Sequence, residues 1–316
     1  MLAPMETITF SPLYMERVWG GRELEHVYGR PLPTAETPYG ESWEMTDRPG
    51  EQSVVNHGSL KGMTLGELWQ EKREDIFGEG FSGDDSFPLL IKILDARDDL
   101  SIQVHPPAEI ADELGGEPKT EMWYIADAAP DAKLYVGLKS GVTRADFQRA
   151  IENGTVDQVV HAISPKKGDS IFIPSGRLHA IGAGLLIYEI QQNSDTTYRV
   201  FDWNRMGLDG NPRELHVEES MRCIDFNDVE PAMDEPDGNT LAHCPYFQVD
   251  RLELKAGTSL GNPDAGRFSI VTIVSGQVES SDGRQHAAGD FLLMPRNANP
   301  LTAIDDATIL QTTIPR

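Results

Sequence analysis

The feature that most limits the fold of this chain is its division into short β-prone runs. Val, Ile, Leu and aromatic residues gather in these runs, and Gly, Pro, Asn or Asp bounds each of them. This pattern interrupts the chain too often for long helices and is typical of an all-β barrel or sandwich. We therefore expect a mainly β fold. The clearest runs cover residues 89–94, 170–174, 185–190 and 268–274.

Helical patterns are few, and we expect the helices to decorate the β framework. They cover residues 64–77, 108–114, 143–153 and 217–224. Thr64 precedes Glu67 with the spacing of a capping box, and Thr143 is a suitable N-cap for the third helix.

Residues 228–239 form a segment that separates two parts of the chain. The segment is acidic, rich in Pro and poor in apolar residues, which is the composition of a linker. We predict two domains, residues 1–238 and residues 239–316.

A short internal repeat indicates that the two domains are related. Residues 168–174 and 289–295 share the pattern Gly-Asp-x4-Pro, which predicts a turn, a buried strand and a proline that ends it. The first copy is followed by His179, whereas residues 296–299 after the second copy contain no histidine. If both copies lie in β-barrels, only the first barrel keeps a candidate metal ligand.

Composition argues against several classes of partner. The formal net charge of −24 disfavours a nucleic-acid backbone, because such binding needs a basic surface. No stretch approaches the ~18 apolar residues that span a bilayer, and the N-terminus lacks a signal-peptide pattern. Cys223 and Cys244 are too few for a disulfide framework. We expect a cytoplasmic protein with two reduced, structural cysteines and with neither nucleic-acid nor membrane partners.

Four polar residues form a candidate metal site. Residues 100–107 alternate as a strand does, so Gln103 and His105 point to the same face. Glu121 begins another β-prone run, and His179 follows the first Gly-Asp strand. Any one of them, taken alone, is explained by an ordinary structural hydrogen bond. Together they offer oxygen and nitrogen donors from three strands, which suits zinc or a similar divalent ion.

The spacing of these residues resembles known motifs. Gly168, Pro174, Gly176 and His179 match the second cupin motif, without the Asn that often follows it. Gln-Val-His at 103–105 replaces the usual His-x-His of the first motif. That replacement, with Lys-x-Glu-Met-Trp downstream, resembles type I phosphomannose isomerases. The resemblance extends over roughly residues 18–205 through motifs at 18–22, 40–44, 90–94, 119–123, 189–199 and 202–203.

The resemblance implies a fold, a reaction and a set of site residues. It implies two cupin or jelly-roll β-barrels, with the C-terminal barrel free of metal, and an enzyme that interconverts D-mannose 6-phosphate and D-fructose 6-phosphate. The chain is similar to the short bacterial form, so substrate contacts made by the helical insertion of the long eukaryotic form do not transfer. We expect a monomer or small homo-oligomer with one zinc ion per chain. The implied zinc ligands are Gln103, His105, Glu121 and His179, and the implied active-site polar residues are Lys92, Lys119, Glu189, Asp195 and Arg199.

The expected reaction moves a proton between C1 and C2 of the open sugar through a cis-enediol. It needs a base and a group that stabilises the developing negative oxygen. Glu189 is our first choice for the base, with Lys92 and Lys119 as alternatives. Arg199 suits an enediolate or phosphate oxygen, and Asp195 is expected to orient it. For the phosphate, Arg177, Lys166 and Lys167 are candidates, with Arg199 as the fallback, and we favour a solvated basic turn for Lys166 and Lys167.

Two other functions fit parts of the pattern. Cupins also host metal oxygenases, but Gln103 is a poor ligand for a redox metal and no closely spaced facial triad is evident. A sugar-binding barrel without turnover would not need Lys92, Glu189 and Arg199 beside a complete set of ligands. The ligand set leaves zinc, manganese and cobalt open as the native metal.

Overall fold

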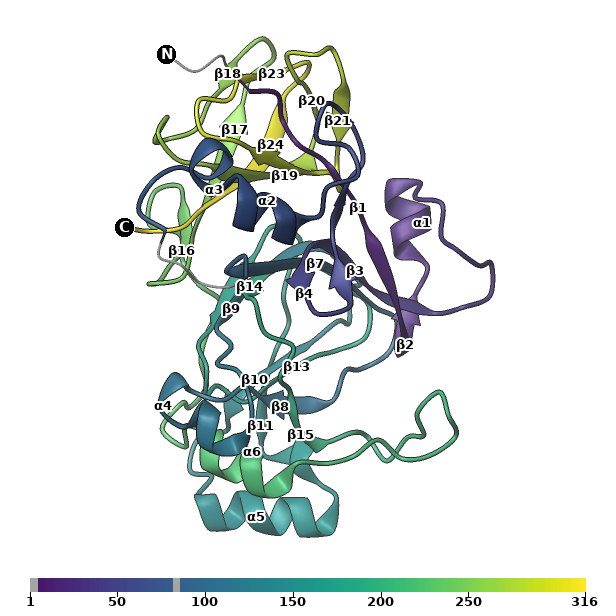
Figure 1. Cartoon of the computed structure of the whole chain (residues 1–316). Coiled ribbons are helices and arrows are strands. Elements are labelled where there is room, and N and C mark those ends of the chain that lie inside the picture. The colour runs from purple at the N-terminus through teal and green to yellow at the C-terminus, as the bar shows by residue number, and fades with distance from the viewer. Residues whose placement is uncertain (1–4, 82–85) are drawn as a thin grey trace. The chain divides into compact units, whose positions relative to one another are not determined.

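The computed structural model describes residues 5–81 and 86–316 (Figure 1). Most of its elements are short strands, and the helices are few and short. This confirms the prediction of a mainly β fold. Within the described ranges, every helix falls short of the length and apolar character needed to cross a membrane.

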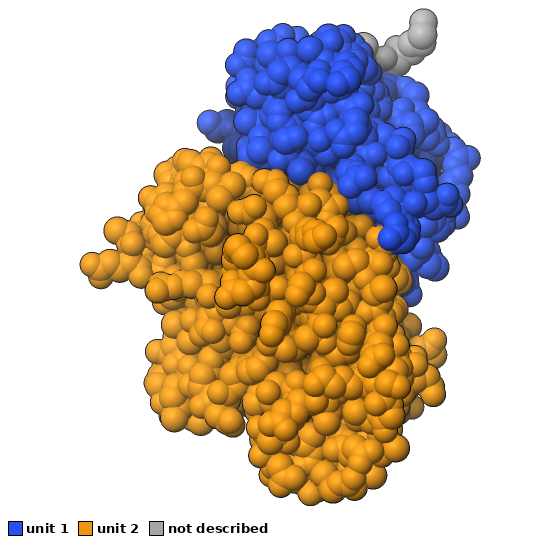
Figure 2. All heavy atoms as spheres, turned by 180° about the vertical axis from the view of Figure 1, so that it is seen from behind, with its two compact units in different colours: residues 1–13, 43–90, 235–316 blue, residues 14–42, 91–234 orange. Residues whose placement is uncertain are grey.

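The chain forms two compact units. Unit 1 contains residues 1–13, 43–90 and 235–316, and unit 2 contains residues 14–42 and 91–234 (Figure 2). The boundary predicted near residue 238 lies close to the last crossing, whereas residues 1–13 and 43–90 cluster with the C-terminal segment. The division into a catalytic and a C-terminal domain stays a prediction.

Unit 2 is built on two antiparallel sheets. The larger sheet contains β2 (Leu13–Gly21), β3 (Tyr39–Met45), β7 (Leu89–Ala96), β9 (Glu121–Ala128), β12 (Ser170–Ile173) and β14 (Leu185–Gln192), in the order β12-β9-β14-β7-β2-β3. The chain crosses between the units within β2, β3 and β7. The smaller sheet contains β8 (Ile102–Val104), β10 (Leu134–Leu138), β11 (Val160–Ile163), β13 (His179–Ile181) and β15 (Tyr198–Phe201), in the order β11-β10-β13-β8-β15.

The two sheets of unit 2 face each other across an apolar core. Trp123, Ile125 and Ile171 of the larger sheet belong to the same buried cluster as Leu134 and Ile181 of the smaller sheet. Each strand turns alternate side chains toward this interior, so polar residues placed there are enclosed between two layers. The interior therefore provides both the core and the place for a site.

Helices cover the outer face of the smaller sheet. They are α4 (Ala108–Ala111) with the 3-10 helix η1 (Asp112–Leu114), α5 (Arg144–Asn153) with η2 (Val156–Gln158), and α6 (Val217–Cys223) (Figure 1). Phe147 of α5 and Cys223 of α6 pack with Ile102 and Val104 of β8. Because neighbours in a strand point to opposite faces, this packing turns Gln103 toward the interior. The helices thus fix the orientation of the strand that carries two candidate ligands.

Unit 1 contains a second pair of sheets. One has the order β16-β17-β24-β19-β22 and the other β18-β23-β20-β21, and an apolar cluster that includes Val271, Leu292 and Ile309 fills the space between them. The strands are β16 (Thr240–His243), β17 (Gln248–Leu254), β18 (Ser259–Leu260), β19 (Ser269–Ser275), β20 (Gln277–Glu279), β21 (Gln285–Ala287), β22 (Phe291–Met294), β23 (Leu301–Ala303) and β24 (Ala307–Thr313). The pairs β1 (Phe10–Ser11) with β6 (Val54–Val55) and β4 (Asp47–Arg48) with β5 (Glu51–Gln52) complete its strands.

The predicted helices are present, but two of them are divided, and residues 108–114 form α4 followed by the 3-10 helix η1. Residues 64–77 form two helices, α2 (Leu65–Glu71) and α3 (Arg73–Ile76), because Lys72 adopts φ −131° and ψ 25°, outside the helical region. The capping box of Thr64 and Glu67 is formed, and Thr143 caps α5 with Asp146. A further helix in unit 2, α1 (Glu23–Tyr28), was not predicted.

The Gly-Asp repeat is the same turn in both units. Gly168 and Gly289 have φ of 92° and 88°, a conformation that glycine adopts without strain. Their amides donate to the carbonyls of Ile125 and Ile273, each at 2.9 Å. The Asp169 and Asp290 carboxylates accept from main-chain N–H groups three residues earlier, at 2.7 and 2.8 Å. The repeated Gly-Asp-x4-Pro pattern therefore marks one structural motif that occurs in both units.

Candidate active site

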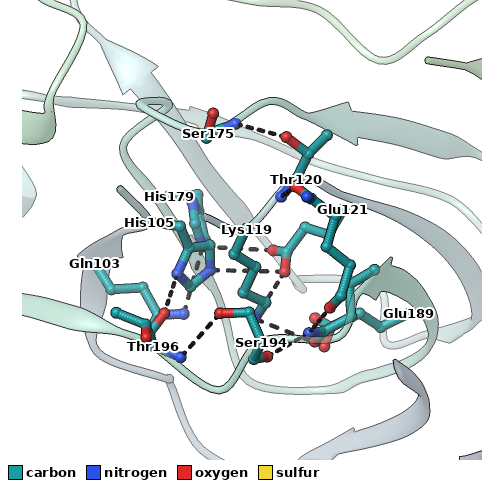
Figure 3. A network of polar contacts seen from close by, with 12 residues as sticks. Gln103, His105, Lys119, Thr120, Glu121, Ser175, His179, Glu189, Ser194 and Thr196 are labelled. Carbon is teal, nitrogen blue, oxygen red and sulfur yellow. Dashed lines mark hydrogen bonds and ion pairs between the residues drawn. The ribbon is translucent and has the colours of Figure 1, made fainter. Parts of the chain in front are cut away.

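Three buried side chains from three strands converge in unit 2. His105 follows β8, Glu121 begins β9 and His179 begins β13, and their nearest ligand atoms all lie within 4.8 Å of one another (Figure 3). His105 Nε2 lies 3.6 Å from Glu121 Oε2, and His179 Nε2 lies 3.6 Å from Glu121 Oε1. Among the described residues, this is the cluster of His, Cys and acidic side chains that is able to hold a metal ion.

The tautomers of both histidines follow from their main-chain partners. His105 Nδ1 donates to the Thr196 carbonyl and His179 Nδ1 donates to the Arg177 carbonyl, each at 2.9 Å. Burial lowers the pKa of His105 to about 3, with a further contribution from the Lys119 charge, and burial also lowers the pKa of His179. Both rings are therefore neutral at physiological pH and turn the Nε2 lone pair toward Glu121.

This arrangement suits a bound cation. Lone pairs of two imidazoles and a carboxylate face one another, and among the described residues His105 Nε2 and Glu121 Oε1 have no hydrogen-bond partner. Burial alone would raise the pKa of Glu121, but the Lys119 ammonium and the neighbouring His105 and His179 together outweigh it and hold this pKa well below its usual range. Two neutral imidazoles and an ionised carboxylate, oriented by hydrogen bonds from behind, form a ligand set for a divalent metal. The residues present therefore fit a metal ion.

Gln103 lies beside this group. It pairs with His179 on one side and Arg199 on the other, in the order β13-β8-β15, so the three side chains share the inner face of the sheet. Gln103 Nε2 lies 3.4 Å from His179 Nε2. The predicted fourth ligand is thus in reach of the same point.

Buried charges of alternating sign extend from the ligands along the larger sheet. Lys119 Nζ lies 2.9 Å from Glu121 Oε2 and 4.0 Å from Glu189 Oε1. Lys92 Nζ lies 3.3 Å from Glu189 Oε1 and 3.9 Å from Glu41 Oε2. Such a series keeps each ion beside a partner of opposite sign, which lowers the cost of burying it.

Glu189 is the member of this series with a raised pKa. Burial is the main cause, and the negative charge of Glu121 adds to it against the opposing Lys119 and Lys92. Glu189 Oε2 accepts a hydrogen bond from Trp123 Nε1 at 3.0 Å, while Oε1 has no hydrogen-bond partner among the described residues. A carboxylate with a raised pKa and one oxygen without such a bond is suited to accept and return a proton.

A cavity of about 520 Å³ joins these groups to solvent, and its lining comes from unit 2 alone. Lys92, Lys119 and Glu189 form part of its wall, and Arg199 and Asp195 lie on it as well. Burial and the nearby charge of Arg213 lower the pKa of Arg199, whose Nε has no hydrogen-bond partner among the described residues. An ionised guanidinium in this position is ready to bind an anion.

Comparison with known proteins gives the family. A model described as the catalytic domain of type I phosphomannose isomerase matches residues 8–127. The mannose-6-phosphate isomerase ManA of Bacillus subtilis (strain 168) is 38% identical over 302 residues, 92% of this chain and 93% of that relative. The probable mannose-6-phosphate isomerase GmuF of the same organism is 42% identical over 304 residues, with 92% and 94% covered. The chain belongs to the type I phosphomannose isomerase family.

A solved structure agrees with this membership. The crystal structure of the Bacillus subtilis mannose 6-phosphate isomerase matches with a TM-score of 0.87 and 32% identity, over 98% of this chain and 100% of that one. The phosphomannose isomerase resemblance seen in the sequence is thereby confirmed, and with it the prediction of an enzyme.

Most residues predicted for a phosphomannose isomerase site lie together in unit 2. Gln103, His179, Lys92, Lys119, Glu189, Asp195 and Arg199 line the cavity, and His105 and Glu121 belong to the candidate metal cluster. Within the described ranges, no hydrogen bond or ion pair joins Asp195 to Arg199. The roles of these residues stay predictions.

The suggested phosphate cations lie elsewhere. Arg177 binds Asp228 through two hydrogen bonds of 2.9 and 3.0 Å, and neither it nor Lys166 or Lys167 lines the cavity. The guanidinium groups that do line it are those of Arg17, Arg199 and Arg213.

Sequence reasoning missed several lining residues. Trp123 shares the face of Glu121 on β9, and Ser101 precedes Gln103 by one strand repeat, so the alternation of these strands was a usable signal. Arg213 lies on the loop after β15 and follows no strand pattern, and its place in the cavity appears only in three dimensions.

Proposed function

We propose that this chain is a zinc-dependent enzyme that interconverts D-mannose 6-phosphate and D-fructose 6-phosphate through a cis-enediol intermediate. The names of its relatives support the substrate. The observation that carries the mechanism is the position of Glu189, a buried carboxylate with a raised pKa, on the wall of the same cavity as Gln103 and His179. We place the site in a cupin-type barrel formed by unit 2.

One zinc ion per chain would be held by Gln103, His105, Glu121 and His179. When bound, zinc supplies a Lewis acid that polarises the carbonyl and the neighbouring hydroxyl of the open-chain sugar. Manganese and cobalt suit the same donors, so metal analysis of the purified protein decides among them.

Glu189 is the proposed base. Its Oε1 takes the proton from C2 of the aldose and returns it to C1 of the enediol, while the proton of the C2 hydroxyl passes to the oxygen on C1, and the reverse sequence runs from the ketose. Lys92 and Lys119, at 3.3 and 4.0 Å from Oε1, balance the charge of the carboxylate before the transfer. Trp123 holds the other oxygen and so fixes the plane of the carboxyl group.

The cationic side of the cavity would bind the negative oxygens of the substrate. Arg17 pairs with Glu41 at 2.9 Å and Arg213 pairs with Asp202 at 2.6 Å, whereas Arg199 makes no such pair among the described residues. We propose that Arg199 binds an enediolate or phosphate oxygen, with Arg17 and Arg213 beside it. A chain with a net charge of −24 needs such a local gathering of cations for a dianionic substrate.

Two broader statements stay predictions from composition and resemblance. They are the cytoplasmic location and a monomeric or small homo-oligomeric state without nucleic-acid or membrane partners.

Proton transfer can be tested by isomerisation in D₂O. The zinc-loaded protein is mixed with mannose 6-phosphate, and the products are followed by NMR. We expect fructose 6-phosphate that carries deuterium at C1, because a proton held by Glu189 exchanges with solvent before it is returned. Product without deuterium would contradict exchange of the transferred proton with solvent at Glu189, and absence of product would contradict the proposed function. Glu189→Gln should yield neither product nor exchange, while it still binds zinc.

A further inference from the structure

The carboxamide of Gln103 has two chemically different ends, and each faces a partner. Its Nε2 lies 3.4 Å from His179 Nε2, and its Oε1 accepts a hydrogen bond from Ser101 Oγ at 3.2 Å. His179 Nδ1 donates to a main-chain carbonyl, so His179 Nε2 carries a lone pair. An amide nitrogen only donates and an amide oxygen only accepts, so these two ends are not interchangeable toward a metal.

Metal ligation requires the opposite orientation of this amide. A cation binds the lone pairs of Oε1 and repels the N–H groups of Nε2. A half-turn about the Cγ–Cδ bond exchanges the two ends and brings Oε1 to the side of His179. The same turn brings Nε2 to Ser101 Oγ.

Ser101 can also form a hydrogen bond with the Gln103 amide when Oε1 faces the ion. A hydroxyl donates or accepts, so Ser101 Oγ can accept a hydrogen bond from Nε2 once Oε1 faces the ion. Ser101 has a relative exposure of only 2% and lies one strand repeat before Gln103, which keeps its hydroxyl beside the amide. Without this hydroxyl, Nε2 would have no acceptor in the ligating orientation. The amide would then turn back more readily to the orientation in which Nε2 faces the ion.

We propose that Ser101 is a positioning residue for the metal centre, which holds the Gln103 carboxamide with Oε1 toward the ion by accepting a hydrogen bond from Nε2. The proposal rests on the metal centre of the proposed function but not on its substrate. It gives Gln103 the same kind of support that main-chain carbonyls give His105 and His179.

The test is the zinc affinity of the full-length protein, measured by competition with a chromophoric chelator in the absence of sugar. Ser101→Ala should lower the affinity by about 10-fold, within the range for loss of a residue behind a ligand. Ser101→Thr keeps the hydroxyl and should restore the parent affinity. In the Gln103→Ala background, Ser101→Ala should cause no further loss, because the group it positions is gone.

Cobalt gives a second readout, since its visible absorption reports the ligands directly. The spectrum of cobalt-loaded Ser101→Ala should move toward that of Gln103→Ala. If Ser101→Ala does not fold, Ser101→Cys, with a weaker acceptor of similar shape, replaces it and should give an intermediate loss of affinity.

A matched control is Ser269→Ala in unit 1. Ser269 also bridges amide side chains, since it donates to Asn262 Oδ1 and accepts from Gln311 Nε2, and it should leave zinc affinity unchanged. The inference fails if Ser101→Ala binds zinc as tightly as the parent, or if it causes an equal loss with and without Gln103. A folded parent that binds no zinc overturns the metal centre itself, whereas tight zinc binding without turnover of mannose 6-phosphate leaves this inference standing and contradicts the proposed function alone.

Discussion

The two units use the same turn and the same strand pairing, yet their interiors differ at the positions that face each other. Glu121 of unit 2 pairs with Ile173 on the strand after the Gly-Asp turn, and Ser269 of unit 1 pairs with Met294 at the matching place. A carboxylate in one unit thus corresponds to a hydroxyl in the other.

A second position shows the same replacement. Glu189 pairs with Trp123, which pairs with Ile171, and in unit 1 the corresponding series is Gln311, Val271 and Leu292. Gln311 Nε2 donates to Ser269 Oγ at 3.0 Å, so the two neutral groups satisfy each other. In unit 2 the carboxylates instead face imidazoles and lysines.

The comparison shows that the β framework and the polar residues placed on it vary independently of each other. At these matched positions, the Ser269–Gln311 pair and an apolar filling give unit 1 a stable core, whereas charges and acceptors without hydrogen-bond partners in unit 2 cost stability and create a site. Substitutions in the two units should therefore affect different measurable quantities.

The largest expected effect is that of His179→Ala. Loss of a ligand should remove bound zinc and lower turnover by about 10³-fold or more, since the Lewis acid is worth several kcal/mol. Metal analysis after gel filtration and a turnover assay measure both quantities. His286→Ala removes another buried histidine, bonded to Ser280 in unit 1, and should keep zinc and turnover. Loss of zinc in His286→Ala would contradict the assignment of the metal site to unit 2 alone.

Arg199→Ala should separate metal binding from catalysis. The variant should keep its zinc, because Arg199 is not a ligand, and should lose about 10²- to 10³-fold in kcat/KM, as expected for loss of one group that stabilises a negative oxygen. Lys167→Ala is the control. Its ammonium lies on the surface, 3.7 Å from Asp127, and KM should stay the same. Full activity in Arg199→Ala would remove this residue from the site.

The raised pKa of Glu189 predicts a pH dependence of activity. A base must be ionised to accept a proton, so kcat/KM should fall as the pH drops through the pKa of Glu189. Because burial raises this pKa, the acidic limb should lie above the ordinary glutamate value of 4.5. Trp123→Phe removes a hydrogen bond to the carboxylate and should move the limb to higher pH. A profile that stays flat down to the ordinary value would speak for Lys92 or Lys119 as the base.

Ile309→Ala in unit 1 should have the smallest effect on chemistry. Ile309 is fully buried among apolar side chains, so its truncation should lower the free energy of unfolding by about 2–5 kcal/mol. Below the unfolding transition, zinc content and kcat should match the parent. Thermal unfolding and a turnover assay at low temperature check this. A selective loss of kcat in the folded variant would contradict the claim that the β framework of unit 1 and the site residues of unit 2 vary independently.

The local parts of the fold could be predicted from sequence. Thr64 and Thr143 carry capping signals within a few residues, and the Gly168 and Gly289 turns use hydrogen bonds that begin within their own motifs. Helix α1 could not be predicted in this way. Its first amide is bound by Asp95, a distant residue, while Arg22 occupies its N-cap without a side-chain bond. A helix start made by tertiary contact leaves no local signal.

The residues of the candidate site fall into the same two groups, those that local patterns predict and those that only tertiary contacts place. Its ligands follow strand alternation and family motifs. The family resemblance placed Glu189 among the site residues, and its carboxylate made it the first choice for the base. The phosphate candidates do not line the cavity. Arg177 instead pairs with Asp228, fifty-one residues away, and no local pattern shows this pairing. Arg213 reaches the cavity because Asp202, eleven residues earlier and on the other side of an irregular loop, anchors its guanidinium.

The most direct test of the account is a coupled assay that detects fructose 6-phosphate formed from mannose 6-phosphate, run before chelation, after chelation and after zinc is added back. The account predicts turnover that chelation abolishes and zinc restores, together with loss of that response in His179→Ala. Turnover that survives complete removal of metal would contradict a metal-dependent site in unit 2, and a folded, zinc-loaded protein without turnover would contradict the isomerase itself.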